Sequence, residues 1–285
     1  MKQIPAEITT EPLMPLTCRN FRRRSTVAGL TICLAILVPQ AVKAADDGFS
    51  TVIPPSFTGE ELRYQQDLWG LEVTIKPMRM VYVPVRNPRT GAKSSEMIWY
   101  LAYKIVNRPV VRPAAADTDS VNVEDAPPPR IFSPRATLVY EDRDLHGAVA
   151  DSIVPEALQA ILAREGENSA TKSANDLKTS VQITGPLPKV TPADAKKDNA
   201  EYGVFMFRGV NPRTTAFSVY LSGFSNAYKT GKAESGSAPI LRRTIVIPYR
   251  RPADEYDQFE KEIRQSGTAR WIYVPDEPKS EASAK

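Results

Sequence analysis

The sequence predicts a mostly β protein, an antiparallel β-sandwich with two short peripheral helices. In Met97–Asn107, alternate residues from Met97 to Ile105 are all apolar, as on one buried face of a strand. Similar short runs, rich in aromatic and β-branched residues, recur between turns that contain Pro, Gly or Asn. Only two stretches place their apolar residues at helical spacing.

Residues 1–44 have the order of an export signal. Arginines at 22–24 precede the apolar run Val27–Val38, whose twelve residues are too short to span a bilayer comfortably. A plain Sec signal fits better than a twin-arginine signal, because Ser25 and Thr26 stand where a large apolar residue is expected. A signal retained as an anchor is the alternative.

The small residues Val42 and Ala44 suit the −3 and −1 positions of a signal cleavage site. We therefore expect the exported protein to begin near Ala45, and N-terminal sequencing of that protein measures this directly. An intact Met1, or Met14 as a second possible start, would contradict it.

Removal of residues 1–44 changes the charge and the chemistry of the chain. The segment holds six of the 37 basic and two of the 33 acidic residues, so the remainder is electrically balanced. A nucleic-acid partner would need a basic excess, and this class is therefore excluded. Both cysteines, Cys18 and Cys33, also lie in the segment. Disulfides, thiolate catalysis and cysteine-bound zinc are excluded with them, and we expect no cofactor and no metal.

The rest of the chain divides by composition. We expect an irregular lead-in over 45–69, a sandwich domain over 70–275 and a polar tail over 276–285, with no membrane span after signal cleavage. Residues 108–130 are rich in Pro, Ala and Asp and have no apolar period, which predicts a disordered insert. The expected strands are Leu71–Val85, as two short strands or one bent at Pro77, Met97–Asn107, Ala136–Tyr140, Ser180–Leu187, Glu201–Phe207, Ala216–Gly223, Leu241–Tyr249 and Arg270–Val274.

Two turns carry nearly the same sequence, at residues 87–92 and 211–216. Each begins Asn-Pro-Arg-Thr, and Asn and Pro favour the first two positions of a β-turn. We therefore expect each turn to join the strands beside it as a hairpin. A duplication of two sandwich halves and the reuse of one favourable turn both explain the similarity.

Helices are predicted over Pro155–Arg164 and Asp254–Gln265. The first begins with Pro and has a stripe of Leu and Ile, while the second shares aromatic residues on one face and ends before Gly267. Many short strands with two such helices favour an immunoglobulin-like architecture.

An acidic cluster, Glu141, Asp142 and Asp144, is the densest group of candidate site residues. It could bind calcium or supply an acid and a base for glycoside cleavage, although a solvated turn has the same composition. His146 is the only histidine, and no nucleophile motif accompanies it.

Aromatic and basic side chains form the second set of candidates. Trp69 and Trp271 could offer flat faces to a glycan or peptide, whereas Trp99 falls on the apolar face of its strand. Arginines at 242–243 and 250–251 bracket one strand and could bind an anionic glycan or only cap the strand ends.

Several stretches together resemble a family of uncharacterised exported bacterial proteins. They are WYLAYKIVN (99–107), PRATLVYEDRDLHGAVADSIVPEALQAILARE (134–165), YLSGFSNAY (220–228), LRRTIVIPYRRPADE (241–255) and RWIYV (270–274). The resemblance covers most of residues 70–275 and implies an immunoglobulin-like β-sandwich. Ala253 stands where the family has a glycine, which puts a tight turn there in doubt. The family implies no activity, so no functional residue is carried over.

The function predicted from the sequence is that of an exported, non-enzymatic protein of the periplasm or cell envelope. It would bind or scaffold an envelope protein or glycan. The alternative is a carbohydrate-active enzyme or lectin that uses the acidic cluster and exposed aromatic side chains. An enzyme would bring the cluster to His146 or to another carboxylate in a concave pocket, and a scaffold would leave it on a convex turn.

Overall fold

A computed structural model describes residues 48–86, 89–112, 130–142, 145–167, 176–232, 238–252 and 262–275. The predicted signal segment 1–44, most of the predicted insert and the polar tail 276–285 lie outside these ranges. The described chain is mostly β, as predicted, and its sheets are antiparallel except for one short parallel pair, β8 with β10. Within these ranges, no helix has the length and apolar composition that a membrane crossing needs.

The first sheet is organised around its longest strand, β4. Its strands are β1 (Thr51–Ile53), β2 (Leu71–Ile75), β3 (Arg79–Arg86), β4 (Lys93–Asn107), β10 (Ala200–Arg208) and β8 (Lys178–Thr179). β2 and β3 pair with successive parts of β4, so this part of the chain forms two short strands, one before and one after Pro77. The predicted hairpin of β3 with β4 is confirmed, since Arg86 pairs with Lys93.

The second sheet is organised around β13. Its strands are β12 (Tyr228–Thr230), β13 (Ile240–Arg250), β11 (Ala216–Ser222), β6 (Arg135–Asp142), β7 (Leu145–Ala150), β14 (Arg264–Gln265) and β15 (Arg270–Pro275). A separate ribbon pairs β5 (Ile131–Phe132) with β9 (Gly185–Pro186).

The predicted hairpin across Asn211–Thr214 is wrong. β10 pairs with β4 and β8 in the first sheet, whereas β11 pairs with β6 and β13 in the second. The turn therefore carries the chain from one sheet to the other. Nine residues of β10 pair with β4, and β11 pairs with a long strand on each side. Each strand therefore forms more backbone pairs in its own sheet than it would form with the other strand as a hairpin.

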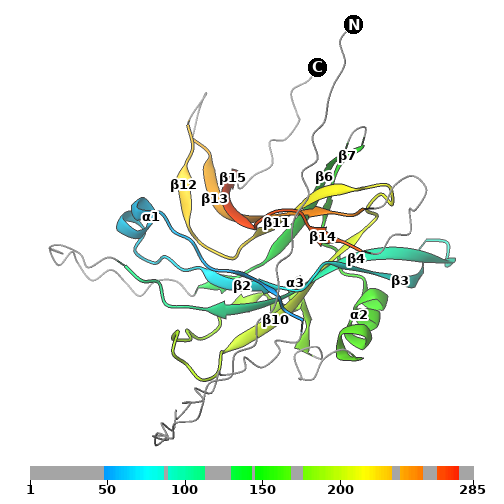
Figure 1. Cartoon of the computed structure of the whole chain (residues 1–285), viewed down its shortest axis with the longest axis horizontal. Helices are drawn as coiled ribbons and strands as arrows, with labels where there is room; N and C mark the ends of the chain where they lie inside the picture. The colour runs from blue at the N-terminus through cyan, green and yellow to red at the C-terminus, as the bar shows by residue number, and fades with distance from the viewer. Residues whose placement is uncertain are drawn as a thin grey trace, which may run out of the picture. The chain divides into compact units, whose positions relative to one another are not determined.

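A common core joins the facing sides of the two sheets (Figure 1). The predicted inward face of β4 is confirmed, because Trp99, Leu101, Tyr103 and Ile105 all belong to this core. The opposite face of β4 is covered as well, because Ile98, Tyr100 and Ala102 are buried there in a second cluster that includes residues of α2.

Three helices are present in the described ranges. They are α1 (Gly59–Tyr64), α2 (Pro155–Glu167) and α3 (Ser180–Ile183). α2 confirms the first predicted helix and covers the outer side of the first sheet (Figure 1). α3 replaces part of the predicted strand Ser180–Leu187. Of the second predicted helix, Arg264–Gln265 form β14 instead, and residues 253–261 lie outside the described ranges.

The lead-in is more regular than the sequence predicted, since β1 and α1 both lie in it. The first residues of the predicted insert are also packed. Arg108 forms ion pairs with Glu72 at 3.0 Å and Asp198 at 2.8 Å. Arg112 donates hydrogen bonds to the backbone carbonyls of Leu62 and Gln65. Residues 113–129 of the insert lie outside the described ranges.

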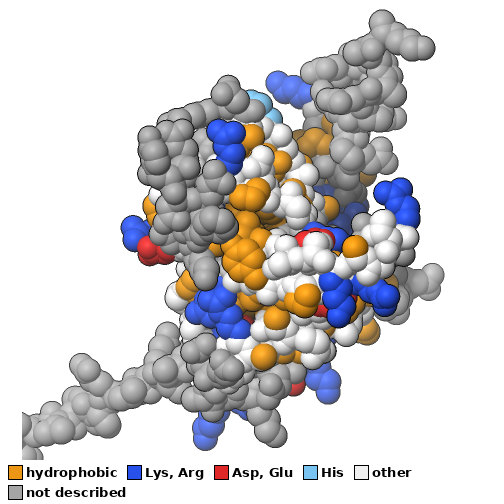
Figure 2. Space-filling model, turned by 90° about the vertical axis from the view of Figure 1, so that its right-hand side faces the viewer, with side chains coloured by type: hydrophobic (Ala, Val, Ile, Leu, Met, Phe, Trp, Pro, Cys, Tyr) orange, Lys and Arg blue, Asp and Glu red, His pale blue; other side chains and the backbone are white. Residues whose placement is uncertain are grey.

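Figure 2 shows one face of the molecule, on which apolar side chains run between scattered Lys and Arg side chains. Apolar atoms make up a large part of most protein surfaces, so this distribution alone marks no site. Candidate sites must therefore come from specific geometry.

Candidate functional site

Glu141 and Asp142 of the predicted acidic cluster are the last two residues of β6, which pairs with β7. Asp142 pairs with Leu145, and Glu141 pairs with His146. His146 is exposed. Asp144 and the side chains of Glu141 and Asp142 lie outside what the structure describes. No group of three His, Cys, Asp or Glu residues suited to a metal occurs among the described residues.

The predicted aromatic candidates have different positions. Trp69 is buried, with 8% of its surface exposed, and therefore offers no flat face to a ligand. Its burial comes from the β11–β12 connection, where Asn226 accepts a hydrogen bond from its backbone N–H. Trp271 is half-buried and donates its Nε1–H to the carbonyl of Pro54 at 2.9 Å. Of the four arginines, Arg243 and Arg251 are buried.

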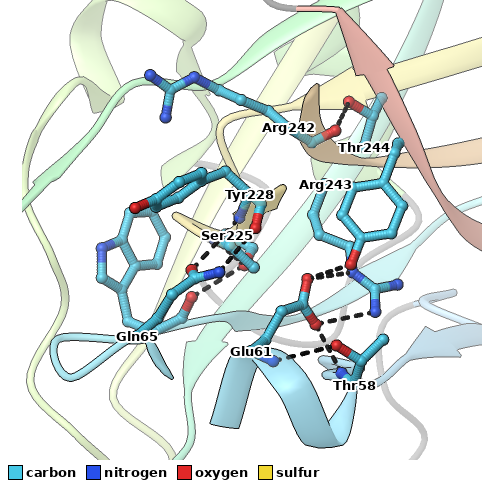
Figure 3. A network of polar contacts seen from close by, with 11 residues as sticks. Thr58, Glu61, Gln65, Ser225, Tyr228, Arg242, Arg243 and Thr244 are labelled. Carbon is cyan, nitrogen blue, oxygen red and sulfur yellow. Dashed lines mark hydrogen bonds and ion pairs between the residues drawn. The ribbon is translucent and has the colours of Figure 1, made fainter. Parts of the chain in front are cut away.

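Glu61 and Arg243 form the centre of a buried polar network that attaches α1 to the second sheet. Nε and Nη2 of Arg243 each lie 3.0 Å from a carboxylate oxygen of Glu61, and Tyr273 donates to the same carboxylate at 2.5 Å. Figure 3 shows Glu61 pointing from α1 toward Arg243, with Thr58 at the helix start. Thr58 and Glu61 form a capping box, which explains why this short helix begins there.

Glu165 forms the second buried network, which attaches α2 to the first sheet. Its Oε2 lies 2.8 Å from Nζ of Lys76, and its Oε1 lies 2.8 Å from Nη1 of Arg79. Tyr100 donates its hydroxyl to Oε1 at 2.7 Å. Glu165 and Lys76 are 1% and 4% exposed, so this is a buried ion pair.

Both carboxylates are held ionised. Burial alone would raise the pKa of Glu61 and of Glu165. At Glu61, hydrogen bonds from Arg243 and Tyr273 outweigh the effect of burial and lower the pKa. At Glu165, hydrogen bonds from Lys76 and Tyr100 and the charge of Arg79 do the same. A general acid needs a raised pKa and access to substrate. The two networks are thus suited to fastening helices rather than to proton transfer.

A groove of about 590 Å³ opens beside the first residues of β10. It is lined by Asp176, Leu177, Lys178, Gln182, Ala200, Glu201 and Tyr202. We call this the β10 groove. β8 and α3 supply one wall and β10 the other, because β8 pairs in parallel with Gly203 and Val204. Its volume falls in the range of roughly 300–1,000 Å³ typical of small-ligand sites.

The walls of the β10 groove combine one ion pair with groups that can bind a ligand. Lys178 lies 3.2 Å from Glu201, both partly exposed. Gln182 is exposed, and its Oε1 accepts the backbone N–H of Thr179 at 2.9 Å in a second capping box. The ring centroid of Tyr202 lies 5.7 Å from that of Phe49. These contacts fix the orientation of the amide and of the phenol ring.

Sequence reasoning missed the β10 groove and both networks, although it could have found part of them. Thr58-x-x-Glu61 and Thr179-x-x-Gln182 match the capping-box pattern in the sequence itself. Glu165 gives no comparable signal, since its partner Lys76 lies 89 residues away in the chain.

Comparisons of this chain with protein-family models, with curated proteins and with solved structures found no match. The candidate function therefore depends on the geometry described above.

Proposed function

We propose that the protein is an exported, non-enzymatic component of the bacterial envelope that binds other envelope material, and that its sheets form an immunoglobulin-like sandwich. The observation that carries the binding role is the β10 groove, which is open to solvent and has oriented polar and aromatic walls. The buried carboxylates Glu61 and Glu165 support the non-enzymatic part, because both serve ion pairs away from solvent.

Export is supported by the composition of residues 1–44 alone. The absence of cysteine from the rest of the chain means that the sandwich depends on its core rather than on disulfides. A core that joins two sheets, with a second core under α2, can supply this stability.

A second candidate is a glycan-cleaving enzyme or lectin that uses Glu141, Asp142 and Asp144. The observation that favours it is the register of β6 and β7, which sets Glu141 opposite His146.

The two candidates give different results with isolated envelope polysaccharide and envelope protein fractions. The exported protein should co-sediment with one fraction and release no reducing ends from it. Tyr202→Ala should lower the bound fraction several-fold, whereas Glu141→Gln should leave it unchanged. Release of reducing ends by the wild type that Glu141→Gln abolishes would establish the enzyme instead.

A further inference from the structure

We propose that the β10 groove binds an oligosaccharide that carries no acidic groups. This inference rests on the proposed binding function and names the ligand class. The groove lies away from the acidic cluster considered from the sequence, since its walls belong to β8, α3 and β10 rather than to the β6–β7 hairpin.

Hydrogen-bonding groups of both kinds face the β10 groove. The Oε1 of Gln182 is occupied by the backbone N–H and the hydroxyl of Thr179, at 2.9 and 3.1 Å. This leaves the Nε2 amide group of Gln182 as a donor of fixed orientation. Asp176 is exposed and supplies carboxylate acceptors on the same wall. Sugar hydroxyls both donate and accept, so a carbohydrate can satisfy both groups at once.

An aromatic side chain forms the apolar part of the opposite wall. Tyr202 is half-buried, and its ring packs against Phe49 at an angle of 51°. Leu177, which is 6% exposed, adds apolar surface to the lining. The C–H face of a pyranose ring is apolar and flat, and it packs well on a phenol ring of fixed orientation.

The charges of the β10 groove select against acidic ligands. Lys178 and Glu201 neutralise each other at 3.2 Å, so the carboxylate of Asp176 is the remaining charge among the lining residues. An acidic glycan would place a second negative charge beside it. The net charge of the lining is therefore negative, which disfavours an acidic glycan and does not oppose a neutral or cationic one.

Calorimetric titration of the exported protein with tetrasaccharides tests the proposal. The probes are neutral tetramers of N-acetylglucosamine, glucose and galactose, the deacetylated glucosamine tetramer as the cationic form, and the galacturonate tetramer as the anionic form. At least one neutral or cationic tetramer should bind at least tenfold more tightly than the anionic galacturonate tetramer.

Gln182→Ala and Asp176→Ala should each weaken that binding at least fivefold. Both side chains are exposed, so the variants should fold, although Gln182→Ala also removes the capping contact with Thr179. Tyr64→Ala on α1, where 71% of the tyrosine is exposed, is the matched control and should bind as the wild type does. Preference for the galacturonate tetramer, binding that ignores both groove variants, or no binding of any tetramer would each overturn the proposal. If the protein still co-sediments with envelope material in that case, only the ligand class has failed and the binding function stands.

Discussion

Trp99→Ala should unfold the protein or leave it close to unfolding. The side chain is 0% exposed and lies in the core between the sheets. Its ring meets Phe217 edge-on at 5.1 Å, and the guanidinium carbon of Arg251 lies 5.5 Å from its ring centroid. Truncation of a buried large aromatic typically costs about 3–5 kcal/mol, through lost transfer free energy and the cavity left behind. That is a large share of the roughly 5–15 kcal/mol that stabilises a domain.

Urea titration followed by far-ultraviolet circular dichroism measures this loss, and Trp271→Ala is the matched control. Trp271 is half-buried in β15, so its truncation should lower the free energy of unfolding by less. Trp69→Ala should also be costly, because Trp69 is buried in the same core. A Trp99→Ala variant that unfolds at the wild-type urea midpoint would show that the face of β4 that carries Trp99 is not buried in the core.

Glu165→Gln should have the second largest effect on stability. It leaves the ammonium group of Lys76, 4% exposed, without its carboxylate partner, and the guanidinium of Arg79 loses the same partner. Removal of one member of a buried ion pair typically costs about 3–5 kcal/mol, because the remaining charge is desolvated and uncompensated. Glu96→Gln is the control, since Glu96 and Arg208 form a partly exposed pair worth about 0–1 kcal/mol.

The same variant makes a prediction about pH. Because the pKa of folded Glu165 lies below its ordinary value of 4.5, the unfolded chain binds this proton more readily than the folded protein does. The stabilisation is therefore complete above about pH 4.5 and is lost as the pH falls through the lower folded pKa. Wild type should lose stability on acidification more steeply than Glu165→Gln. Parallel stability–pH curves from pH 7 to pH 3 would contradict the assigned ion pair.

The strand predictions succeeded where the signal was local. The alternation in β4 follows directly from burial of one face of a strand, so the sequence alone identifies Trp99 as a core residue. The turn at Asn211–Thr214 was identified by its residues as well. Turn chemistry, however, does not tell whether the next strand pairs with the preceding one or crosses to another sheet, and β11 crosses.

The candidate site was harder to predict because its parts are distant in the sequence. Tyr202 gains its fixed position from Phe49, and β8 reaches β10 across more than twenty residues. Trp69 was a candidate ligand contact from its sequence, yet it is buried where its backbone bonds to Ser225 and Asn226. Neither relationship leaves a periodic pattern in the chain.

The lead-in has a consequence for the order in which the protein can fold. Its contacts are among the longest in sequence, with 182 residues between Glu61 and Arg243 and 214 between Thr51 and Gln265. A chain that emerges N-terminus first must therefore wait for its last strands before α1 can dock. Such non-local closure slows folding, because loop entropy is lost before the contacts form. If the protein is exported through a translocon, as proposed above, α1 would stay undocked until the last strands have crossed.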